Sequence, residues 1–241
     1  MTPRLPYEDA ALPIEQRVDD LMDRLELDDK IGLLYFPYGF VADAEQPDPY
    51  GRPAMADRIR GGRILHFLVQ GSPGNPRDYA EWANQVQRIA EEHPLRIPVT
   101  LISDPRHAVT DNPLTSNLAG AMSRWPEPIG IAAIGSEEAA REFGDTVRQE
   151  YSAAGFVGAC HPQIDLATEP RWARIPQTFG ESAELTSRLV RAYIEGLTGS
   201  AAPRPGTQGL RRRGRSPRLR GLRDRGRLPR CRRRRHRPDE H

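Results

Sequence analysis

The sequence has few of the features that mark disulfide-rich, membrane or secreted proteins. It contains two cysteines, Cys160 and Cys231, which form neither a disulfide framework nor a CxxC motif. No stretch approaches the roughly 20 apolar residues of a membrane-spanning helix. Residues 1–17 lack the apolar segment of a secretory signal. These absences favour a cytoplasmic protein that does not contact a membrane.

Motifs for common cofactors are also missing. The sequence has no glycine-rich phosphate loop and no dinucleotide-binding fingerprint. Its histidines do not show the spacing of metal ligands. We therefore expect neither a cofactor nor a metal ion. Cys160 lies in an apolar run, which predicts a buried thiol.

Lysine is nearly absent, since Lys30 is the only one, and the charges are unevenly distributed. From Pro203 onward the chain has 16 arginines and 3 acidic residues, a net charge of +13. The first 202 residues carry 19 basic and 30 acidic residues, a net charge of −11. The segment from Pro203 contains no Phe, Tyr or Trp. Because it has so little to bury, we predict that it is disordered.

Three interpretations of this basic segment remain open. It could bind nucleic acid non-specifically, because clustered arginines neutralise phosphates without a fold. It could be a solvated extension without a function. The hypothesis we favour is a change of reading frame, because arginine, proline and glycine all have GC-rich codons and the segment contains no lysine. We place the boundary between a folded domain, residues 1–199, and the tail, residues 200–241.

Apolar periodicity predicts helices that alternate with strands in the first 199 residues. Helices are predicted at residues 12–34, 136–154 and 182–197, and another opens at Asn75-Pro76 with an apolar face that runs from Tyr79 to Ile89. Buried strands are predicted at residues 63–70, 97–103 and 156–165. Residues 38–60 are predicted as a loop with a short helix near residues 54–60. The alternation indicates an α/β fold with a parallel sheet, either doubly wound or part of a (β/α)8 barrel.

Two segments carry a more specific signal. Residues 98–109 read PVTLISDPRHAV, and residues 164–181 read IDLATEPRWARIPQTFGE. Together they resemble glycoside hydrolase family 3, the β-glucosidase-like family, and the resemblance covers roughly residues 12–199. It implies an incomplete (β/α)8 TIM-type barrel, a β-linked sugar or glycoside as the partner, and retaining hydrolysis as the family reaction.

The resemblance assigns substrate binding to Asp104 and Arg174, with His107 and Asp165 as supporting residues. Asp104 and Arg174 each follow a predicted strand, on the side where such barrels place their sites. A carboxylate accepts hydrogen bonds from sugar hydroxyls, and a guanidinium donates them. Without the resemblance, Asp104 would favour a simple turn, and Arg174 a surface ion pair.

The sequence departs from the family pattern at several positions. Ala173 stands where members often have Gly, Gln177 where they have Glu, and Val109 near a usual Gly. The family chemistry needs two carboxyl groups about 5–5.5 Å apart, a nucleophile and an acid/base. Neither has a matching position here, and the family's Lys-His pair is absent too. We therefore assign no catalytic residue and expect no hydrolysis. The alternative is a non-catalytic protein that binds carbohydrate, or nucleic acid through its tail.

Overall fold

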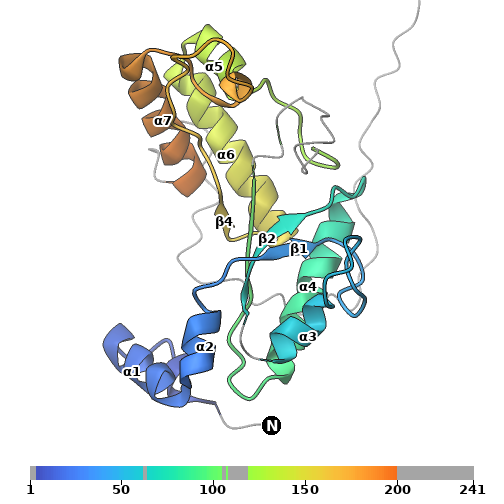
Figure 1. Ribbon diagram of the computed structural model, residues 1–241. Coiled ribbons are helices and arrows are strands. Elements are labelled where there is room, and N and C mark those ends of the chain that lie inside the picture. The colour runs from blue at the N-terminus through green and yellow to red at the C-terminus, as the bar shows by residue number, and fades with distance from the viewer. Residues whose placement is uncertain (1–3, 62–63, 105–106, 108–118, 200–241) are drawn as a thin grey trace, which may run out of the picture. The chain divides into compact units, whose positions relative to one another are not determined.

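The computed structural model describes residues 4–61, 64–104, 107 and 119–199 (Figure 1). The predicted disordered tail lies outside the described residues. The helices are α1 (Ile14–Arg24), α2 (Leu27–Gly32), α3 (Met55–Arg60), α4 (Pro76–Glu92), α5 (Pro128–Ile134), α6 (Glu137–Ala154) and α7 (Ala183–Thr198), with 3-10 turns η1 (Pro6–Glu8) and η3 (Ile175–Gln177). The strands are β1 (Tyr38–Phe40), β2 (His66–Gln70), β3 (Thr100–Ser103) and β4 (Gly158–Ala159).

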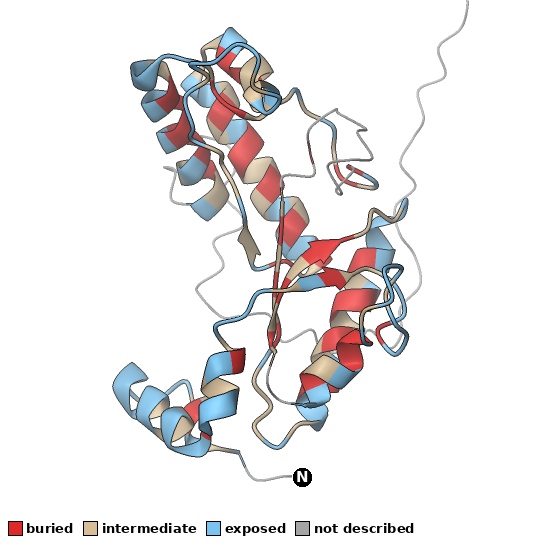
Figure 2. Ribbon diagram, in the orientation of Figure 1, coloured by how far each residue is buried: buried red, intermediate tan, exposed pale blue. Residues whose placement is uncertain are grey.

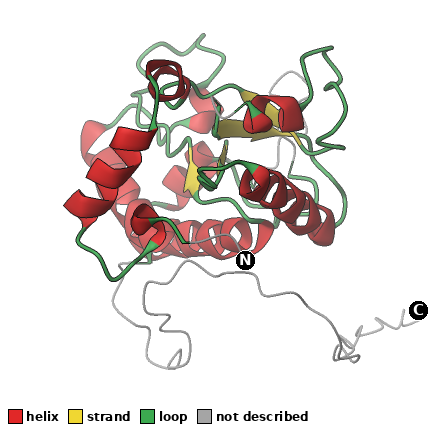
Figure 3. Cartoon of the chain, turned by 90° about the horizontal axis from the view of Figure 1, so that it is seen from below, coloured by secondary structure: helices red, strands yellow, loops and turns green. Residues whose placement is uncertain are grey.

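These four short strands form one parallel sheet in the order β1-β2-β3-β4. Figure 3 shows the strands in yellow and the helices in red. The register pairs Phe40 with Gln70 and Ser103 with Ala159. Strand order follows chain order without a reversal. A doubly wound sheet reverses its order at a switch point, whereas a (β/α)8 barrel does not. The sheet therefore confirms the α/β prediction and has the topology of part of a barrel.

The core lies between the sheet and the long helices, whose inner faces are buried (Figure 2). The apolar face predicted for α4 is buried in full: Tyr79, Trp82, Ala83, Val86 and Ile89. It belongs to the same cluster as Phe67 and Val69 of β2 and Leu101 of β3. The sheet residues that precede the site are thus held by side chains from several helices.

The predicted helix starts are confirmed by their capping hydrogen bonds. The Asn75 side chain accepts from the Arg77 backbone N–H at 3.0 Å, immediately before Pro76. The Ser136 and Ser182 hydroxyls accept backbone N–H groups at the starts of α6 and α7, both at 3.3 Å. Short polar side chains at these positions satisfy donors that the helix itself leaves unpaired.

Several element boundaries differ from the sequence prediction. Strand β1 lies in a segment predicted as loop, because its three residues are too short for periodicity and depend on pairing with β2. Strand β4 covers two residues instead of residues 156–165. Helix α5 was not predicted. The helix expected over residues 12–34 is divided into α1 and α2.

Helix α1 is amphipathic, as predicted, but its apolar face is covered only in part: Leu25, the last residue of the predicted face, is buried. Ile14, Val18 and Met22 are spaced by four residues and are 70%, 50% and 44% exposed. No residue of α1 is buried. Within the described part of the chain, no helix is long and apolar enough to cross a membrane.

Candidate functional site

Asp104 lies where the sequence placed it, directly after β3 at the carboxyl edge of the sheet. The neighbouring strand β4 ends at Ala159, and the Cys160 backbone N–H donates to the Ser103 carbonyl oxygen at 3.0 Å. Cys160 is exposed, so the prediction of a buried thiol was wrong. Its pKa is raised by partial desolvation of the thiol and by the charge of Asp104. Asp104 and Cys160 therefore lie close together on adjacent strand ends.

His107, the predicted supporting residue, is completely buried. Its Nε2 atom lies 2.9 Å from the Glu150 Oε2 atom near the end of α6. Because an ionised carboxylate only accepts hydrogen bonds, we assign the His107 proton to Nε2. The next residue of α6, Tyr151, donates its hydroxyl proton to the Asp104 carbonyl oxygen. The end of α6 thus contacts both Asp104 and His107.

His161 follows β4 and belongs to the same region, although no sequence pattern selects it. Its Nδ1 atom and the Tyr193 hydroxyl of α7 form a hydrogen bond, and its Nε2 atom is buried. Burial, together with the neighbouring His107, lowers the pKa of His161 to about 3. Burial also raises the pKa of Tyr193, so its hydroxyl keeps its proton and donates to Nδ1.

Arg174 is exposed and lies further along the segment that follows β4. Its Nε donates to the Gln177 Oε1 atom at 2.8 Å, and its Nη2 donates to the Gln163 Oε1 atom at 2.5 Å. These bonds tie the turn that carries Arg174 to the residues directly after His161. Asp165 lies in this segment and is also exposed. Arg174 and Asp165 are therefore accessible to solvent, whereas His107 is not.

Some residues of segment 164–181 stabilise the fold instead of facing solvent. Thr178 and Phe179 are buried, and Phe179 joins the core. The Thr178 hydroxyl donates to the Ile175 carbonyl oxygen at 2.9 Å. Gly180 has φ of +98°, which disfavours side chains. These residues shape the turn that presents Arg174.

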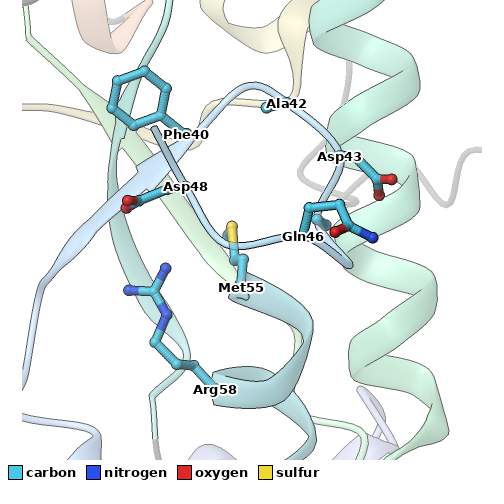
Figure 4. A pocket seen from close by; sticks show the side chains of 8 residues that line it. Phe40, Ala42, Asp43, Gln46, Asp48, Met55 and Arg58 are labelled. Atoms are coloured by element: carbon cyan, nitrogen blue, oxygen red, sulfur yellow. The ribbon is translucent and has the colours of Figure 1, made fainter. Parts of the chain in front are cut away.

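Two hollows lie away from Asp104. The first is a cavity of about 10 Å³ beside the end of β1, where Arg58 reaches toward Asp48 (Figure 4). It has room for about one water molecule and none for a sugar. The second, of about 320 Å³, is lined by residues of the segment after β4 and by α7, including Ile164, Leu166 and Val190. Its lining is largely apolar and contains no charged side chain.

No group of three or more His, Cys, Asp or Glu residues could hold a metal ion in the described ranges. The arrangement instead offers a carboxylate at the end of β3, an accessible guanidinium, the buried His107 and the half-buried His161. Carboxylate and guanidinium are the groups that bind hydroxyl-rich ligands most strongly. A parallel sheet in chain order, with Asp104 directly after β3 at its carboxyl edge, has the topology of part of a (β/α)8 barrel protein.

Residues 27–206 match the model of the glycosyl hydrolase family 3 N-terminal domain, so the chain belongs to this family. It is 40% identical over 195 residues to a probable beta-glucosidase C of Aspergillus oryzae. The match covers 80% of this chain and 31% of that protein. A periplasmic beta-glucosidase/beta-xylosidase of Dickeya chrysanthemi is 42% identical over 196 residues, 80% of this chain and 30% of its own.

A solved β-glucosidase structure from Erythrobacter marinus has the same fold. It superposes with a TM-score of 0.63 at 23% identity, covering 82% of this chain and 25% of that one. The chain thus spans about a third of the length of the relatives it matches. These likenesses support the partial barrel that the strand order indicates.

Proposed function

We propose that this chain forms part of a binding site for β-linked glycosides, as the N-terminal portion of a family 3 barrel. The observation that carries the proposal is Asp104 at the carboxyl end of β3, in a chain that belongs to this family. Barrel enzymes build their sites at this edge. The names of the Aspergillus and Dickeya relatives support a β-glucoside as the ligand class.

Each site residue has a distinct proposed role. The Asp104 carboxylate accepts hydrogen bonds from two adjacent sugar hydroxyls. The Arg174 guanidinium donates to hydroxyls, and Gln163 and Gln177 support this role because they fix its orientation. Asp165 adds a second accessible carboxylate, whereas His107 acts indirectly because it is buried.

The proposed family reaction is retaining hydrolysis of β-linked sugars, which needs a nucleophile and an acid/base. We assign neither role to a residue of this sequence. We therefore propose that the chain alone binds a glycoside without hydrolysing it, because positioning groups without a nucleophile or an acid supply binding only.

The first test combines a turnover assay with a binding assay on the purified full chain. We expect no release of nitrophenol from an aryl β-glucoside. We expect binding of methyl β-glucoside to be weakened about tenfold or more by Asp104→Ala, which removes charge-assisted hydrogen bonds. Arg174→Lys should also weaken it, because lysine cannot reproduce the planar fork.

Arg171→Lys is the matched control, since Arg171 lies in the same segment, is exposed and pairs with Glu169 at 2.8 Å. It should bind like the wild type. Hydrolysis that Asp104→Ala abolishes would refute the proposed inactivity. Equal binding by wild type and Asp104→Ala would refute the proposed site.

We also propose a boundary for the folded domain and a location in the cell. The family match ends at residue 206 and one compact unit ends at Ala201, which supports a folded domain over residues 1–199. We propose a cytoplasmic location, although the Dickeya relative is named as periplasmic. A second proposed activity, non-specific binding of nucleic acid by residues 200–241, is favoured by the 16 arginines in this segment.

A further inference from the structure

A single carboxylate oxygen holds two distant parts of the chain together. Glu150 Oε2 accepts the Ser123 backbone N–H at 2.9 Å and lies 2.9 Å from His107 Nε2. His107 and Ser123 stand on either side of residues 108–118, in the connection that follows β3. The Trp125 backbone N–H also donates to the His107 carbonyl oxygen at 2.7 Å. Both ends of this connection are therefore attached to the same point on α6.

Tyr151, the residue after Glu150, connects α6 to the backbone of Asp104, the proposed ligand-binding residue. Tyr151 donates to the Asp104 carbonyl oxygen, and its ring lies 5.5 Å from the His107 ring. The His107 side chain is completely buried, whereas the Glu150 side chain is 30% exposed. A buried N–H that loses its acceptor costs more free energy than an exposed one. Glu150 thus accepts a hydrogen bond from a buried ring N–H of His107, whose loss would carry this larger cost.

We propose that Glu150 is a positioning residue for the glycoside site: it fixes His107 and Ser123, and through them the direction in which Asp104 leaves β3. This inference rests on the proposed function of Asp104. Glu150 does not contact the ligand in this arrangement. Removing its carboxylate takes away the acceptor of two N–H groups, and His107 and Ser123 shift relative to the end of β3.

The experiment uses nuclear magnetic resonance on the full chain labelled with ¹⁵N, comparing wild type, Glu150→Ala and Glu150→Gln. In Glu150→Ala we expect amide hydrogen exchange at Ser123 to be about tenfold faster, because the loss of one hydrogen bond changes an opening equilibrium by about that factor. The His107 Nε2–H signal should disappear and the Asp104 amide signal should shift. Glu150→Gln keeps an acceptor oxygen and should restore these signals in part.

Glu142→Ala is the matched control, because Glu142 lies on the same helix and is exposed. It should leave all three signals unchanged. Unchanged exchange at Val147, which is buried in α6, would show that a variant is still folded. Wild-type signals from Ser123, His107 and Asp104 in a folded Glu150→Ala protein would overturn the proposal.

Titration with methyl β-glucoside separates the positioning role from the proposed function. We expect Glu150→Ala to bind about tenfold more weakly than wild type, with Glu150→Gln between them. Unchanged affinity despite shifted signals would make Glu150 a structural residue only and overturn the proposal. If the wild type does not bind the sugar, the proposed glycoside site fails, while the Ser123 and His107 signals still decide whether Glu150 positions this connection.

Discussion

His161 is half-buried, and its ring nitrogens lie in surroundings that favour the neutral form of the imidazole. Its Nδ1 atom accepts from Tyr193, and its Nε2 atom has no hydrogen-bond partner among the described residues. A protonated ring would lose hydration, would break the bond from Tyr193, and would lie near His107. These effects together explain why the pKa of His161 is lowered to about 3.

The shifted pKa of His161 predicts that the protein loses stability in mild acid. Between pH 6.5 and about 3 the unfolded chain binds a proton at His161 that the folded chain does not. Stability is therefore greatest above pH 6.5 and falls as pH decreases, by about 1.4 kcal/mol per pH unit from this residue alone. Urea unfolding at pH 7, 6 and 5 measures the slope, and His161→Gln should reduce it.

His66 keeps part of the pH dependence in that variant, because burial lowers its pKa too. The slope of His161→Gln should therefore be smaller than that of the wild type but not zero. An unchanged slope in His161→Gln would contradict the assignment of a strongly lowered pKa to this residue.

At the scale of elements, helices α6 and α7 lie side by side and cross at two glycines (Figure 1). A Cβ atom added to Gly144 would lie 2.2 Å from the Tyr193 carbonyl oxygen. One added to Gly196 would lie 2.1 Å from the Arg141 carbonyl oxygen. Both contacts are with backbone, which cannot rotate away. The crossing also places Tyr193 of α7 beside His161, so it supports the site.

We predict that Gly144→Ala and Gly196→Ala each lower the free energy of unfolding by about 1–3 kcal/mol or more, because the helices must move apart. Gly74→Ala is the control, since no atom lies within 4 Å of its added Cβ, and it should change stability by less than about 0.5 kcal/mol. Urea unfolding followed by circular dichroism measures all three. Equal stability of Gly144→Ala and Gly74→Ala would contradict the close crossing.

At the scale of the whole molecule, the fold does not explain the uneven distribution of charge along the sequence. The first 202 residues carry a net charge of −11 and the remainder +13. An acidic domain repels nucleic acid, whereas a segment with 16 arginines attracts it. The hypothesis of a changed reading frame also concerns this segment, and sequencing the coding DNA past codon 195 would test it.

The charge distribution predicts that deletion of residues 203–241 abolishes binding to double-stranded DNA. Binding by the full chain should weaken about a thousandfold between 50 and 200 mM salt, because arginines that neutralise phosphates release counterions. Fluorescence anisotropy with a labelled duplex measures both effects. Binding that resists salt, or that survives the deletion, would require contacts other than those between arginine and phosphate.

The sequence by itself determined helices α4, α6 and α7, the position of Asp104 after β3, and the family. Helices α4, α6 and α7 were predicted because capping residues and apolar periodicity are local signals. The position of Asp104 after a buried strand was predicted for the same reason. The segment around Arg174 identified the family, which the comparison confirmed.

Only the tertiary structure decided the short strands, the exposure of Cys160 and the group of residues around His107 and His161. Strands β1 and β4 have three and two residues, so pairing with their neighbours defines them. The bonds of Glu150 to His107 and of Tyr193 to His161 join residues 43 and 32 positions apart. No local pattern encodes such contacts, because they form when packing brings the end of α6 and the middle of α7 to the carboxyl edge of the sheet.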